Sequence, residues 1–139
     1  MQPRIEEKRK VNNMSKQPVM IDAQYLKDHP KDIFVFGDNL LRKGTGGAAA
    51  LRYNPNTYGF ITKKAPSLDD SAYFTPKEYL FVFLKELKQL RLNIELNPDK
   101  TVLISKLGSG LANKYHIWEE VISPRISELK AYKNVKFLF

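Results

Sequence analysis

The chain contains no cysteine and only two histidines, His29 and His116. The lack of cysteine excludes disulfides, thiolate metal sites and cysteine nucleophiles. The shortage of histidine excludes a histidine-rich metal cluster, so we predict no metal site and no cofactor, with carboxylates left available for a hard cation. No stretch approaches the roughly 20 apolar residues of a membrane-spanning helix, and residues 1–16 lack the apolar run of a signal peptide. We therefore predict no membrane partner and a cytoplasmic location, in the host cytoplasm if the protein is viral.

The length of 139 residues suits one domain, and the 42% hydrophobic and 27% charged content is typical of a globular protein. The formal charge of +8 favours anionic partners, either nucleic acid or a phosphorylated small molecule. A lysine-rich surface without such a partner would have the same charge. Residues 1–17 are mostly polar, and we predict that they form a flexible basic arm. Residues 18–139 are predicted to form the ligand-binding domain.

Short apolar runs between turn residues predict the strands. Ile33–Phe36 and Thr101–Ser105 are continuously apolar or nearly so, which is typical of parallel strands covered on both faces. Tyr58–Thr62 predicts another strand, Val19–Ile21 a first one and Val135–Phe139 a terminal one.

Helical signals alternate with these strands. Asp22 is placed to cap a helical turn over Ala23–Lys27, and the composition of Ala48–Tyr53 favours a helix. The segment Thr75–Glu78 is a capping box that predicts a helix as far as about Leu92. This alternation predicts an α/β fold with three αβα layers and a mainly parallel or mixed sheet.

Two local patterns allow more specific expectations. A helix is predicted after the glycines at 108 and 110, and Pro124 should kink or restart it with Ser123 as the new cap. Tyr73 and Phe74 stand directly before the capping box. They are interpreted either as a hydrophobic staple or as rings that stack on a base.

Two of the predicted strands run into glycine-bearing loops. One enters Gly37–Asn39 and continues to Gly44–Gly47, and the other enters Gly108–Gly110. Ligands of open α/β sheets bind beyond the carboxyl ends of the strands, and free backbone N–H groups at helix starts suit phosphate. Neither loop is a P-loop or a dinucleotide fingerprint. The alternative interpretation of each loop is a tight turn.

The order of these motifs resembles the macrodomain, the ADP-ribose-binding fold. That family has a strand ending in Asn-Ala-Ala-Asn, a Gly-Gly-Gly-Val loop that opens a helix, and a later Gly-x-Gly loop. The resemblance covers residues 32–139, and it extends to short phage-borne proteins related to macrodomains. It implies a macrodomain-like fold that binds ADP-ribose, a related nucleotide or an ADP-ribosylated macromolecule. Asn39 matches the last asparagine of the first motif, which in the family approaches the distal ribose.

The loops and the resemblance together define a set of candidate residues. Arg42, Lys43 and Lys63 are placed to neutralise phosphate, or to lie in solvent. The predicted ligand-binding residues are Gly37, Asn39, Gly44, Thr45, Gly46, Gly47, Thr62, Lys63, Gly108, Ser109, Gly110 and Tyr115.

The catalytic candidate is Asp38, which follows the buried strand and would activate water toward an anomeric carbon or phosphorus. Its alternative role is a loop cap that accepts backbone N–H groups. Many hydrolytic macrodomains carry an aspartate where this chain has Ala48, and the resemblance therefore favours binding over hydrolysis of an ADP-ribosyl bond. Whether the protein is an enzyme stays open. A nucleic-acid-binding module and a protein inhibitor remain as alternatives.

Overall fold

The sheet is built around the apolar run near the start of the described chain. A computed structural model describes residues 20–139, and in it that run forms β1 (Asp32–Asn39). The other strands are β2 (Thr57–Lys63), β3 (Thr101–Ile104) and β4 (Val135–Phe137). They stand in the order β2-β1-β3-β4, and each neighbouring pair is parallel. The predicted parallel sheet and these strand positions are confirmed.

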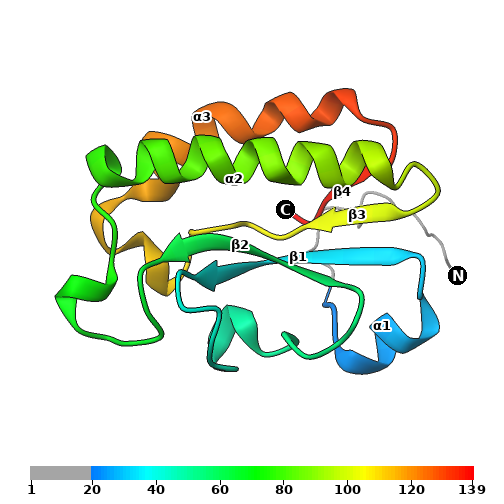
Figure 1. Ribbon diagram of the computed structural model, residues 1–139, viewed down its shortest axis with the longest axis horizontal. Helices are drawn as coiled ribbons and strands as arrows, with labels where there is room; N and C mark the ends of the chain where they lie inside the picture. Colours follow the sequence, from blue (N-terminus) through cyan, green and yellow to red (C-terminus); the bar gives the residue numbers. More distant parts are fainter. Residues whose placement is uncertain (1–19) are drawn as a thin grey trace, which may run out of the picture.

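Helices cover both faces of this sheet (Figure 1). α2 (Pro76–Leu96) and α3 (Ser123–Ile126) lie on one face, whereas α1 (Ala23–Asp28) and the short 3₁₀ turn Gly47–Ala49 lie on the other. The three-layer αβα arrangement expected from the sequence is therefore confirmed.

The long helix α2 begins where local chemistry places it. Thr75 accepts a hydrogen bond from the backbone N–H of Glu78, and the Glu78 side chain accepts one from the N–H of Thr75. The rings of Phe74 and Tyr79 pack with their centroids 5.3 Å apart, which is the contact of a hydrophobic staple. The staple interpretation of Phe74 is confirmed. α2 continues for one turn beyond the predicted end, to Leu96.

The two faces of the sheet bury different amounts of apolar surface. Most of the hydrophobic core lies between the sheet and the layer of α2 and α3, where residues such as Val35, Phe83 and Ile122 are fully enclosed. On the opposite face, Leu26, Phe36 and a few other side chains are buried outside that cluster. Polar contacts have to close this thinner face.

The predictions of local structure are wrong for two segments before β2. Met20 and Ile21 are not in a strand, and Val19 lies outside the described residues, as does the arm predicted over residues 1–17. Only Gly47–Ala49 of the glycine-loop segment is helical, as a 3₁₀ turn, and Ala50–Tyr53 forms turns. Six residues are too few to sustain a helix by propensity alone.

The segment after β3 is also more irregular than predicted. It forms a 3₁₀ helix over Leu111–Tyr115 and a π-helical turn over Trp118–Ile122 before α3 begins. The chain does restart as an α-helix near Pro124, but Ile122 is the N-cap and no side chain caps it. The prediction that Ser123 caps this helix is therefore wrong. Within the described residues, no helix is long and apolar enough to cross a membrane.

Gly108 is required by packing at the point where β3 leads into this segment. Its φ is +72°, and a Cβ built there would stand 2.6 Å from Cδ1 of Ile122 and 3.3 Å from Cδ1 of Ile117. Both isoleucines belong to the core. A side chain at position 108 would therefore meet both backbone strain and overpacking.

We predict that Gly108→Ala lowers the free energy of unfolding by about 2–4 kcal/mol, as the sum of the left-handed backbone cost and the core clash. The matched control is Gly46→Ala, because Gly46 has φ −83° and no atom within 4 Å of a built Cβ. Urea unfolding of both variants measures the difference. Equal stability of the two variants would contradict this account.

Candidate functional site

The carboxyl ends of the strands meet at one edge of the sheet, as parallel pairing requires (Figure 1). The chain leaves β1 toward β2 on one side, whereas it leaves β3 toward β4 on the other. The point between β1 and β3 is thus the topological switch point, where open α/β sheets bind ligands. We call the surface formed by residues 40–46, 64–72 and 105–110 the carboxyl-edge surface.

The first loop is held by the side chain of Asn39. Its Nδ2 donates to the carbonyl of Lys43 at 2.8 Å, and its Oδ1 accepts from the N–H of Leu41 at 3.1 Å. Asn39 is buried, and both ends of its amide are used by its own loop. It therefore shapes the loop rather than facing outward from it.

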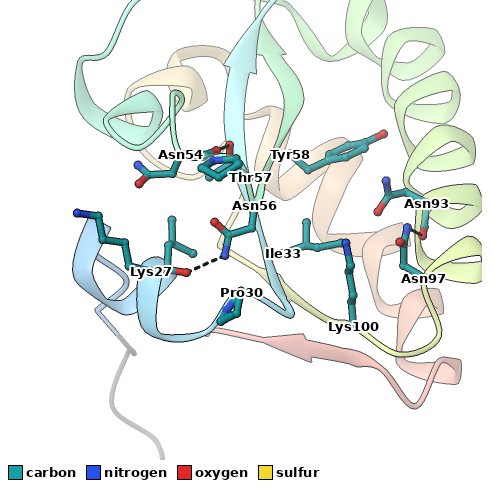
Figure 2. A pocket seen from close by; sticks show the side chains of 12 residues that line it. Lys27, Pro30, Ile33, Asn54, Asn56, Thr57, Tyr58, Asn93, Asn97 and Lys100 are labelled. Carbon is teal, nitrogen blue, oxygen red and sulfur yellow. Dashed lines mark hydrogen bonds between the residues drawn. The ribbon is translucent and has the colours of Figure 1, made fainter.

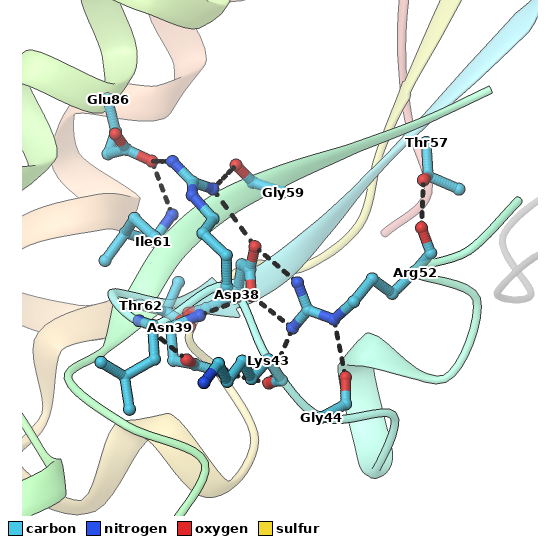
Figure 3. A network of polar contacts seen from close by, with 12 residues as sticks. Asp38, Asn39, Lys43, Gly44, Arg52, Thr57, Gly59, Ile61, Thr62 and Glu86 are labelled. Atoms are coloured by element: carbon cyan, nitrogen blue, oxygen red, sulfur yellow. Dashed lines mark hydrogen bonds and ion pairs between the residues drawn. The ribbon is translucent and has the colours of Figure 1, made fainter. Parts of the chain in front are cut away.

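Asp38 is the centre of a buried ion-pair network (Figure 3). Its side chain is 2% exposed and lies 2.5 Å (Oδ1) and 3.1 Å (Oδ2) from the two terminal nitrogens of Arg52. Arg42 donates to Oδ2 at 3.2 Å, and the backbone N–H of Asn39 donates to Oδ1 at 2.7 Å. The last contact is the loop cap that was expected as the alternative role of this residue. Both carboxylate oxygens are occupied.

Arg52 connects the network to the glycine loop. Its Nε donates to the carbonyl of Gly44 at 2.7 Å, and Nη2 donates to the carbonyl of Lys43 at 3.0 Å. Its guanidinium also lies 5.5 Å from the centre of the Phe36 ring, and its side chain is only 9% exposed. Arg52 thus covers part of the thin face of the sheet. Sequence reasoning missed it because the segment was assigned to a helix.

Gly59 provides the space for this carboxylate. A Cβ at this position of β2 would stand 2.3 Å from Oδ2 of Asp38. Such a distance is impossible, so the buried aspartate requires a glycine on the neighbouring strand. A glycine inside a strand pattern signals a close approach, and this signal could have located the network from the sequence.

The electrostatics of Asp38 follow from these contacts. Burial by itself raises the pKa of the carboxyl group. The hydrogen bonds from Arg52, from the N–H of Asn39 and from Arg42 oppose burial and outweigh it, so the pKa is lowered below its ordinary value. Asp38 is therefore a stabilised anion and a weakened base.

The glycine loop itself lies in the open. Gly44 and Gly47 have φ of +92° and +53°, and no atom lies within 4 Å of a Cβ built on Gly46 or Gly47. Thr45 is exposed as well. A Cβ on Gly44 would touch Cβ of Pro66 at 3.2 Å, so the first loop lies against the second. Gly37, by contrast, lies within β1 beside Thr62.

Two lysines and an aromatic ring connect the loop of residues 64–72 with the segment that follows residues 105–110. Nζ of Lys63 lies 4.8 Å from the centre of the buried Tyr73 ring, and Nζ of Lys114 lies 5.4 Å from the same ring. Lys63 also donates to the carbonyl of Ser67 at 2.8 Å, and burial lowers its pKa. Lys114 forms an ion pair with Asp70. Two ammonium groups thus lie over one ring beside the glycine loops, and that of Lys114 is paired with Asp70.

The remaining predicted residues differ in how far they are buried. Thr62 is buried, and its hydroxyl donates to the carbonyl of Asp38 at 3.4 Å. The Ser109 hydroxyl donates to the carbonyl of Lys106, and a Cβ on Gly110 would meet no atom within 4 Å. Tyr115 is half-buried, with Nζ of Lys114 5.9 Å from its ring centre. The described residues contain no group of three His, Asp or Glu side chains that could hold a metal ion.

The fold and this surface define an α/β protein with loops at the switch point of a parallel sheet. The chain belongs to a family of unknown function, DUF7831, whose model matches residues 17–114. The match spans β1, β2, β3 and α2, and therefore includes the Asp38 network. No curated protein and no solved structure matches the chain.

The Asp38 network also closes the free edge of the sheet. β2 is the edge strand, where Gly59 and Ile61 direct their backbone groups away from β1. Arg42 donates to the carbonyl of Gly59 at 2.7 Å, and Glu86 accepts from the N–H of Ile61 at 2.7 Å. Nη2 of Arg42 and Oε1 of Glu86 lie 3.9 Å apart. Together the two side chains cap an edge that would otherwise present unpaired groups.

We predict that Asp38→Asn lowers the free energy of unfolding at pH 7 by about 3–5 kcal/mol, because two arginines lose a buried partner. Since the folded pKa is lowered, the stabilisation by Asp38 is present above the ordinary pKa of 3.8 and is lost as the pH falls through the folded value. The difference between the wild type and the variant should therefore shrink below about pH 4.

Urea unfolding at several pH values measures this dependence. Asp99→Asn is the control, because Asp99 is exposed and should change stability little at any pH. A difference between wild type and Asp38→Asn that stays constant down to pH 2 would contradict the assignment.

We predict that Glu86→Ala costs about 1–3 kcal/mol of stability, because the N–H of Ile61 loses its acceptor. Glu86→Gln keeps an oxygen in place and should cost less, which separates the hydrogen bond from the charge. Thermal unfolding of both variants compares them. A glutamine variant as unstable as the alanine variant would assign the effect to the Arg42 ion pair instead.

Proposed function

We propose that the protein binds ADP-ribose or a related nucleotide at the carboxyl-edge surface. The observation that carries this proposal is the meeting of open glycine backbone and lysine ammonium groups at the switch point of the sheet. Gly46, Gly47 and Gly110 are exposed, Lys63 ends β2, and Lys114 lies in the 3₁₀ helix after the last loop. A diphosphate needs close backbone approach and positive charge, and this surface offers both.

The resemblance to macrodomains supports the nucleotide rather than a simple anion. In that family the two glycine loops hold the diphosphate, and their counterparts here are Gly44–Gly47 and Gly108–Gly110. We assign Asn39 a positioning role, because its amide is used within its own loop. We assign Gly108 a packing role beside Ile122. Contact with the ligand is then left to the exposed glycines.

Binding fits the chemistry of the site better than hydrolysis by Asp38. A general base has to reach a water molecule and accept its proton. The oxygens of Asp38 already accept hydrogen bonds from Arg52, Arg42 and the N–H of Asn39, and its pKa is lowered. We therefore propose that Asp38 holds the loop in the shape that binds the ligand, and that it does not transfer protons.

The net charge of +8 also suits a nucleic acid, and salt dependence separates the two ligands. Neutralising many phosphates of a nucleic acid releases counterions, so the affinity falls steeply with added salt. A single nucleotide held by backbone N–H groups releases few counterions. Its affinity should therefore change little over the same range.

We predict saturable binding of ADP-ribose in isothermal titration calorimetry at about 50 mM and about 200 mM salt, with less than a tenfold change in the dissociation constant. Gly46→Glu should abolish this binding, because a carboxylate would occupy the open backbone and repel phosphate. Gly46→Ala is the matched control and should keep most of the affinity.

Absence of heat with ADP-ribose at either salt concentration would overturn the ADP-ribose proposal. Equal affinity of wild type and Gly46→Glu would place any ligand elsewhere. Steeply salt-dependent binding of a single-stranded oligonucleotide, without binding of ADP-ribose, would favour the nucleic-acid module.

A further inference from the structure

A cavity lies at the amino-terminal end of the sheet, opposite the carboxyl-edge surface (Figure 2). Its volume is about 480 Å³, within the range of small-molecule sites. It lies between α1, the turn before β2 and the last turns of α2. None of the residues of the carboxyl-edge surface lines it. The cavity is therefore separate from the proposed ADP-ribose site.

The wall of this cavity is unusually rich in amide side chains. Four asparagines line it, namely Asn54, Asn56, Asn93 and Asn97. Three of them have structural duties. Asn56 donates to the carbonyls of Leu26, His29 and Asp32, Asn54 donates to that of Leu51, and Asn97 donates to that of Asn93.

Asn93 differs from the other three. Its Oδ1 is buried and meets no hydrogen-bond donor in the described part of the chain. A buried carbonyl oxygen without a donor is costly, and native structures rarely keep one without a reason. Asn93 lines the cavity and this oxygen lies just beneath its wall, so a turn of the amide group would let a ligand N–H donate to it.

The surroundings of Asn93 define the rest of the ligand. Figure 2 shows the side chains of Asn93 and Lys100 reaching toward the space beside Ile33 and Tyr58. Ile33 is buried and Tyr58 is half-buried, so this part of the wall is apolar and includes one aromatic ring. Lys100 places a cation at the rim. The site thus combines an apolar face, one unpaired acceptor and a positive charge.

We propose that this amino-end cavity binds a nucleoside monophosphate. The base lies against Ile33 and Tyr58, and an N–H group on its edge donates to Oδ1 of Asn93. The phosphate group meets Lys100. Planar heterocycles with ring or amino N–H donors are the ligands that such an amide reads, and the phosphate supplies the counter-charge. The proposal does not depend on ligand binding at the carboxyl-edge surface.

The test is a titration of the ¹⁵N-labelled full chain with AMP, GMP, CMP and UMP in turn. The amide chemical shifts of the protein are the readout. We expect saturable shifts around Asn93 and Lys100 for at least one of them. The matching nucleoside and inorganic phosphate should each bind at least tenfold more weakly, because each keeps only one of the two recognition elements.

Two variants test the site and two serve as controls. Asn93→Leu removes the amide at similar volume, and Lys100→Gln removes the charge. Each should weaken binding of the best monophosphate about tenfold, the equivalent of one hydrogen bond or ion contact. Lys133→Gln, at an exposed lysine elsewhere, and Gly46→Glu, at the carboxyl edge, should leave it unchanged.

Absence of saturable binding by all four monophosphates would overturn this assignment. So would loss of binding in Gly46→Glu with full binding in Lys100→Gln, because the ligand would then lie at the carboxyl edge. If Asn93→Leu proves unfolded by its thermal transition, Lys100→Gln decides alone. Failure of ADP-ribose to bind the wild type, with the monophosphate result intact, would overturn only the function proposed for the other edge.

Discussion

The ion pair between Asp38 and Arg52 is the contact through which the end of β1, the glycine loop and the edge of the sheet are connected. One carboxylate at the end of a buried strand accepts from two arginines and from a backbone N–H. Arg52 also donates hydrogen bonds to the carbonyls of Lys43 and Gly44, and so ties the glycine loop to this carboxylate. Removing a carboxylate from water is unfavourable, and bidentate pairing with a planar guanidinium offsets that cost.

The same network explains how a thin face of the sheet is closed without a long helix. α2 covers one face with apolar side chains, whereas within residues 20–139 the other face is covered by α1 and short turns. Arg52 lies over the ring of Phe36 and fills part of this gap with a guanidinium group that donates to Asp38 and to the carbonyl of Gly44. Arg42 adopts φ of +54°, which is uncommon for a residue with a side chain, and its contacts with Asp38 and Gly59 hold it there.

Within one loop, the residues that build it differ from those that stay exposed. Asp38, Asn39 and Arg52 are used to build the loop, and Gly46 and Gly47 at its tip are left uncovered. A rigid loop with an open backbone loses little conformational freedom when an anion binds. At the other end of the sheet, the asparagines before β2 are used in the same structural way, and Asn93 on α2 is not. Each end of the sheet thus carries polar side chains with structural duties.

Much of the secondary structure could be predicted because its causes are local. The apolar run at Ile33–Phe36 and the capping box at Thr75–Glu78 act through neighbouring residues, and both appear in the structure as expected. The helix predicted over Ala48–Tyr53 did not form, because Arg52 makes its contacts with Asp38, which is distant in sequence. Helical propensity over so few residues is weak, and a buried ion pair outweighs it.

In the candidate site, too, the features with local causes could be predicted and those that depend on distant residues could not. From the amino-acid order one can read which strands are apolar, where glycine interrupts the chain, and that Asp38 and Asn39 follow a buried strand. Folding brings Asp38 against two arginines and against Gly59, which leaves room for its carboxylate. It also places Lys63 and Lys114 over the same Tyr73 ring. Pairing between β1 and β2 and the turn of the loop bring these groups together, and contacts between distant residues leave no periodic pattern in the sequence.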